Sequence, residues 1–170
     1  MPFLALLQTG SLIVLAVLLV VAAWQDLRTL HISNSLPLSI VGVFVVWSLL
    51  GLAAGTSTAA EIALSIGCAV MLFLVAAAAF AAGMIGGGDV KLIATTALFA
   101  GPSLMPDFLL VVGIVGGVLG IVVLAGVQIG PIAHADGATA RGRLQSRLPY
   151  GPAIAAGGLW VAATLACALK

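Results

Sequence analysis

Long apolar runs fill almost the whole chain, and they restrict its fold more than any other feature. A helix needs about 20 mostly apolar residues to cross the hydrocarbon core of a bilayer. Of the 170 residues, 63% are hydrophobic and only 6% are charged, a composition far outside the range of soluble domains. The predicted spans are residues 3–24, 36–54, 61–83, 91–105, 108–130 and 151–169.

These runs predict an all-α integral membrane protein that forms one domain over residues 1–170. Open backbone cannot face lipid, so the spans must be helices, and the 21 glycines permit close packing between them. The fourth run is the shortest and reaches only about 22 Å at 1.5 Å per residue. Because Gly101 and Pro102 lie near its end, we expect this run to be tilted, partly re-entrant or differently bounded. The first run is too long for a signal peptide core, so we expect it to be retained.

The few cations predict the orientation of the chain. In a six-span model Arg28 and Lys91 fall on the same side as a cluster between the last two spans, which consists of Arg141, Arg143 and Arg147. The opposite connections, 55–60 and 103–107, contain no Lys or Arg, and only Lys170 disagrees. The positive-inside rule therefore places the N-terminus outside and the basic loops in the cytoplasm. The arginine cluster is expected to attract anionic lipid head groups.

The chain has five carboxylates, and two of them are the candidate catalytic groups. Glu61 and Asp107 begin predicted spans, where a carboxylate complements the helix dipole, and Asp136 lies in a polar turn. Asp26 ends the first apolar run, and Asp89 directly follows three glycines. A glycine run suits a sharp bend or a close approach to another chain segment. Two carboxylates brought together make an acid/base pair.

Three segments resemble the motifs of one family. The sequence DLRTLHISN at 26–34 is similar to the first acidic motif of the prepilin peptidases, the type IV leader peptidase family. The sequence GGGDVK at 86–91 resembles their GxGD-x-K motif, and LPYGPAIAAG at 148–157 resembles the Pro-aromatic-Gly-Pro start of their last helix. The resemblance covers most of the chain, in order and spacing. It points to the small members of the family, which serve Flp-type, tight-adherence pili.

The chain departs from the family pattern in two places. Ser33 stands where the first motif commonly has proline before asparagine, and the first loop has no room for the paired CxxC motifs of the larger, methylating members. The only cysteines, Cys68 and Cys167, stand singly within apolar runs. A buried single thiol behaves as a small hydrophobe, so we expect neither a disulfide nor a metal site, and no cofactor.

The resemblance implies an aspartic endopeptidase in the inner membrane of a bacterial cell. Its substrate is a prepilin, in which a short leader precedes one long apolar helix, and no nucleic acid is involved. Asp26 and Asp89 share one proton, because two neighbouring carboxylates cannot both ionise easily. One activates water for attack on the scissile carbonyl while the other donates a proton, and their roles are interchangeable at this level.

The same motifs suggest supporting residues. Gly86 and Gly88 are expected to let the loop fold so that Asp89 reaches Asp26. Lys91 either raises the local positive potential or simply anchors the topology. Arg28 and Asn34 are expected to fix the first loop through hydrogen bonds to helix carbonyls. The loop before the last helix contributes Pro149, Tyr150 and Gly151.

Two other classes of function remain open on the sequence. A small transporter of protons or cations would also carry acids in its membrane segments, although both acids lie at span ends on one side. Ion flux that Asp89→Asn abolishes would support that class. A non-enzymatic assembly protein of a pilus or secretion machine would instead tolerate Asp26→Asn and Asp89→Asn.

Overall fold

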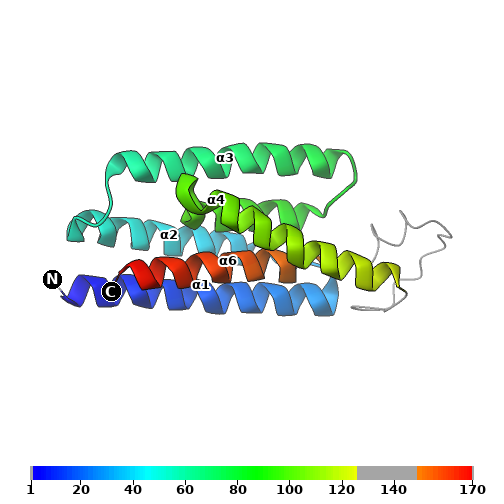
Figure 1. Ribbon diagram of the computed structural model, residues 1–170, viewed down its shortest axis with the longest axis horizontal. Coiled ribbons are helices and arrows are strands. Elements are labelled where there is room, and N and C mark those ends of the chain that lie inside the picture. The colour runs from blue at the N-terminus through cyan, green and yellow to red at the C-terminus, as the bar shows by residue number, and fades with distance from the viewer. Residues whose placement is uncertain (1, 126–148, 170) are drawn as a thin grey trace.

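The computed structural model describes residues 2–125 and 149–169, and their regular structure is entirely helical (Figure 1). The helices are α1 (Pro2–Thr29), α2 (Ser35–Ala54), α3 (Ala59–Ala81), α4 (Gly87–Leu124) and α6 (Gly151–Ala168). Each of these five is long and apolar enough to cross a membrane. The predicted all-α class is therefore confirmed.

The fourth and fifth predicted spans are joined in α4, which consists of two helical stretches that meet at a kink. The number of six membrane spans stays a prediction. The predicted connection at 103–107 is wrong, because those residues are helical. The break lies at Gly101, whose φ of 54° and ψ of −169° belong to a region that only glycine adopts readily. Pro102 follows at once, where a helix start tolerates a missing N–H. Residues 126–130 of the fifth predicted span lie outside the described residues.

Gly101 reverses the chain, so that both ends of α4 lie at the same end of the bundle (Figure 1). The loops between α1 and α2 and between α3 and α4 lie at that end too, as does the start of α6. The N-terminus and the turn between α2 and α3 lie at the opposite end. Gly101 lies beside Ser65, in the first half of α3. The last turn of α1 and the first turn of α4 are therefore brought to a common end, which we call the site end.

The helices pack lengthwise, with α6 against both α1 and α4, α3 against α4, and α2 against both α1 and α4. Close approach of three helices occurs at Gly158 of α6, where a Cβ atom would lie 2.6 Å from atoms of both Leu19 and Thr96. Large apolar side chains such as Val17, Met71 and Ile121 are exposed on the outer face. An outer surface of this kind suits lipid and not water.

Several residues used in the sequence argument lie outside the described residues: Asp136, Arg141, Arg143, Arg147 and Lys170. The predicted orientation rests largely on these cations and stays a prediction.

Candidate active site

Asp26 lies in the last turn of α1 and is held by the start of α6. Its side chain is only 5% exposed. The backbone N–H of Gly151 donates a hydrogen bond of 2.7 Å to its Oδ2 atom. Gly151 is the first residue of α6, where backbone N–H groups have no partner within the helix and the helix dipole is positive. A buried carboxylate of α1 therefore satisfies a free donor of a helix that begins 125 residues later in the sequence.

Asp89 lies in the first turn of α4, directly after the glycine run. The backbone of Gly86, the N-cap residue of α4, lies close to the Asp89 carboxylate. The oxygen nearest Gly86 is Oδ2, which lies 3.0 Å from the place a Cβ atom would take on that glycine. The other oxygen, Oδ1, is buried and has no hydrogen-bond partner among the described residues.

The fold brings Asp26 and Asp89 close enough for their carboxylates to interact electrostatically. Tyr150 completes the group, because its half-buried side chain lies near Asp89. Burial, together with the negative charge of Asp89, raises the pKa of the Tyr150 phenol above its ordinary value. Tyr150 therefore stays a neutral hydrogen-bonding group near physiological pH. Pro149, just before it, is fully buried and fixes the start of α6 against the bundle.

The loop between α1 and α2 packs directly on the start of α4. Lys91 donates a hydrogen bond of 2.8 Å from Nζ to Oδ1 of Asn34. Buried Ile32 lies against Gly88, where an added Cβ atom would be 3.1 Å from the Ile32 Cβ. These two contacts join the first and second motifs. Ile32 was not singled out from the sequence, although it is the apolar residue between polar neighbours in that loop.

Arg28 has a different arrangement from the one expected. Its guanidinium lies 4.4 Å from the centroid of the Trp24 ring on the same helix, a cation–π contact. Asn34 likewise accepts a hydrogen bond from Lys91, whereas the sequence suggested bonds from both residues to helix carbonyls. Arg28 is therefore directed along the surface of α1.

No group of three or more His, Cys, Asp or Glu side chains that could hold a metal ion occurs in residues 2–125 and 149–169. Cys68 and Cys167 are both free thiols. The groups that the described part of the site offers are thus carboxylates, backbone amides and a phenol, which suit acid/base chemistry.

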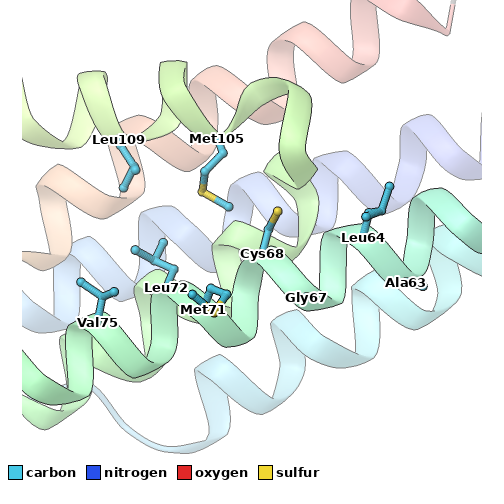
Figure 2. Close-up of a pocket in the computed structure, with 9 residues that line it drawn as sticks. All are labelled: Ala63, Leu64, Gly67, Cys68, Met71, Leu72, Val75, Met105 and Leu109. Carbon is cyan, nitrogen blue, oxygen red and sulfur yellow. The ribbon is translucent and has the colours of Figure 1, made fainter.

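An apolar groove of about 430 Å³ lies between α3 and the second stretch of α4. Cys68 and Leu72 of α3 line one side, and Met105 and Leu109 of α4 line the other (Figure 2). All the residues that line this groove are apolar or small. A surface of this kind accepts an apolar chain segment or lipid tails.

Comparison with known proteins identifies the family of this chain. The family model described as the type IV leader peptidase family matches residues 13–121, more than half of the chain. The matched region contains both Asp26 and Asp89 and ends before α6. Searches among curated proteins and among solved structures found no significant match. The chain belongs to the type IV leader peptidase family.

Proposed function

We propose that this protein is a membrane-embedded aspartic endopeptidase that removes the leader peptide of Flp-like type IV prepilins, with Asp26 and Asp89 as its catalytic pair. Membership of the family supports prepilin leader peptidase activity. The observation that carries the proposal is the proximity of two carboxylates from different motifs, one from α1 and one from α4. Residues 63 positions apart (89 − 26) interact only because the bundle gathers their helix ends at one place.

The pair provides the two functions that peptide hydrolysis needs. Two neighbouring carboxylates repel each other when both are ionised, so the pair retains one proton. The ionised member takes a proton from water as the water oxygen attacks the scissile carbonyl carbon. The protonated member gives its proton to the carbonyl oxygen, and collapse of the tetrahedral intermediate breaks the C–N bond as the leaving nitrogen gains a proton. Water is the nucleophile, so no acyl-enzyme forms.

The location of the pair suits a substrate whose cleavage site borders the membrane. Asp26 and Asp89 lie at the site end of the bundle and not at mid-span. A prepilin helix lying beside the bundle would place its leader junction at that end. The groove between α3 and α4 is apolar enough to receive such a helix. With the orientation expected from the cations, cleavage takes place at the cytoplasmic face of a bacterial inner membrane.

The test is cleavage of a co-expressed Flp-type prepilin, followed by gel shift and N-terminal sequencing of the product. Wild type is compared with Asp26→Asn and Asp89→Asn, which are nearly isosteric, and with Asp107→Asn as a matched control. Asp107 is exposed on α4 beyond the kink. We expect wild type and the control to cleave and both site variants to be inactive at equal abundance. Cleavage that persists in either site variant would remove that aspartate from the mechanism, and a wild type that leaves the prepilin intact would contradict the substrate assignment.

A further inference from the structure

The two carboxylates of the site share a feature that neither motif predicts. Each has one oxygen beside the backbone of a glycine at the start of a helix. For Asp26 the glycine is Gly151, whose backbone N–H donates a hydrogen bond of 2.7 Å to Oδ2. For Asp89 the glycine is Gly86, and Oδ2 lies 3.0 Å from the place that a Cβ atom would take on it. The other oxygen of Asp89, Oδ1, has no partner among the described residues.

Gly151 and Asp26 pack so closely that there is no room for a side chain at position 151. A Cβ atom on Gly151 would lie 2.6 Å from the Asp26 Cβ, 2.7 Å from Oδ2 and 2.9 Å from Cγ. Distances below 3.0 Å do not occur for real Cβ atoms, so only glycine brings the α6 backbone this close to the carboxylate. Gly151 and Asp26 are both buried, so neither can shift freely toward water.

We propose that Gly151 is a positioning residue for Asp26, an inference that rests on the proposed function. Its N–H donates a hydrogen bond to Oδ2 of Asp26 and thereby fixes the rotation of the carboxyl group. The remaining oxygen of Asp26 is thereby kept for the shared proton and the attacking water. Gly86 has the corresponding place beside Asp89, which leaves Oδ1 of Asp89 for the same proton. A carboxylate oriented by a backbone N–H keeps its reactive oxygen in place without side-chain rearrangement.

The chain offers a matched control for the strain of an added methyl group. Gly158 lies on the same helix, α6, and its added Cβ would lie 2.6 Å from Leu19 and Thr96 side-chain atoms. This close contact is as short as the one at Gly151, but it involves core side chains and not the carboxylates. Gly151→Ala and Gly158→Ala therefore impose similar crowding at different places.

The experiment measures kcat and KM for prepilin cleavage by the purified full-length variants, together with their melting temperatures. For Gly151→Ala we expect kcat to fall at least tenfold with KM within twofold of wild type, because the reactive carboxylate moves and the substrate surface does not. For Gly158→Ala we expect the melting temperature to fall about as much as in Gly151→Ala, while kcat stays within about threefold of wild type. Wild-type kcat in Gly151→Ala, or an equal loss in Gly158→Ala, would overturn the proposal.

A second variant tests the N–H itself and is informative even where Gly151→Ala fails to fold. Replacing the amide between Tyr150 and Gly151 by an ester deletes the donor and adds no side chain. We expect the same loss of kcat at unchanged KM, and an ester variant with wild-type kcat would refute the positioning role. Asp26→Asn and Asp89→Asn are measured in parallel. If those variants cleave, the proposed function fails and this inference with it, whereas inactive Asn variants beside a fully active ester variant refute the positioning role alone.

Discussion

The ammonium of Lys91 donates a hydrogen bond of 2.8 Å to the side-chain oxygen of Asn34, which joins α4 to the residue that precedes α2. Asn34 is the N-cap residue of α2, yet its side chain makes no capping bond to that helix. The side chain instead accepts the hydrogen bond from Lys91 of α4. Together with the contact of Ile32 on Gly88, this bond holds the loop after Asp26 against the helix that carries Asp89.

This relationship predicts that Lys91 and Asn34 act as one unit. We expect Asn34→Ala and Lys91→Ala each to lower kcat/KM about threefold to tenfold, and the double variant to lose little more than either single one. Lys91→Gln keeps a donor without the charge. Near-normal activity in that variant would support the hydrogen bond, whereas a loss as large as in Lys91→Ala would favour the electrostatic role considered from the sequence. Fully additive losses in the double variant would show that the two residues act separately.

The contact between Gly88 and Ile32 predicts that a larger residue at position 88 is tolerated only with a smaller residue at position 32. Gly88→Ala gains up to about 1 kcal/mol of helix propensity, but its Cβ would lie 3.1 Å from the Ile32 Cβ and 3.5 Å from the Ile32 nitrogen. Overpacking of this kind costs about 1–3 kcal/mol, so we expect a net loss of stability and activity. Ile32→Gly removes the crowding Cβ atom, so adding it should restore activity in the Gly88→Ala background while lowering activity in the wild type. The measurements are thermal unfolding in detergent and prepilin cleavage, and absence of rescue would contradict the contact.

The kink predicts that Gly101 is the least replaceable glycine of α4. Its φ of 54° and ψ of −169° disfavour any side chain, and an added Cβ would lie 2.8 Å from the Ser65 hydroxyl. Backbone strain of this type costs about 1–3 kcal/mol, and we expect Gly101→Ala to lower stability by about that amount. Gly113, later in α4, has no atom within 4 Å of its added Cβ. Gly113→Ala should therefore be neutral or stabilising by up to about 1 kcal/mol, as chemical or thermal unfolding would show. Equal effects in the two variants would exclude a special role for the kink.

Helix positions were predictable where apolar length decides them. The spans expected at 36–54, 61–83 and 151–169 correspond to α2, α3 and α6 within a few residues at each end. Glu61 was interpreted as a residue that stabilises a helix start, and its side chain forms a capping box with Thr58. These features depend on residues close together in sequence, which is why they could be read from it.

The predicted break in α4 was misplaced because Pro102, Pro106 and Asp107 each mark a possible helix boundary in the sequence. Pro106 and Asp107 look like a helix start, but α4 continues through both. The chain reverses at Gly101 instead. Tertiary packing, including the close approach of Ser65 of α3, sets the backbone conformation of this glycine. The bond from Gly151 to Asp26 was unpredictable for the same reason. Motifs singled out both residues, but only the packing of α6 on α1 shows that they touch.

The predicted orientation of the bundle in the membrane can be tested independently of catalysis. His31 is exposed in the loop at the site end, and Ala60 is exposed in the first turn of α3 at the opposite end. In a Cys68→Ala/Cys167→Ala background, we expect His31→Cys to react with a membrane-impermeant maleimide only in inverted inner-membrane vesicles. Ala60→Cys should react in intact spheroplasts, because the basic residues near the site end favour the cytoplasm. The reverse pattern would place Asp26 and Asp89 outside. Cleavage at the cytoplasmic face would then be impossible, even for an enzyme whose catalytic pair is correctly assigned.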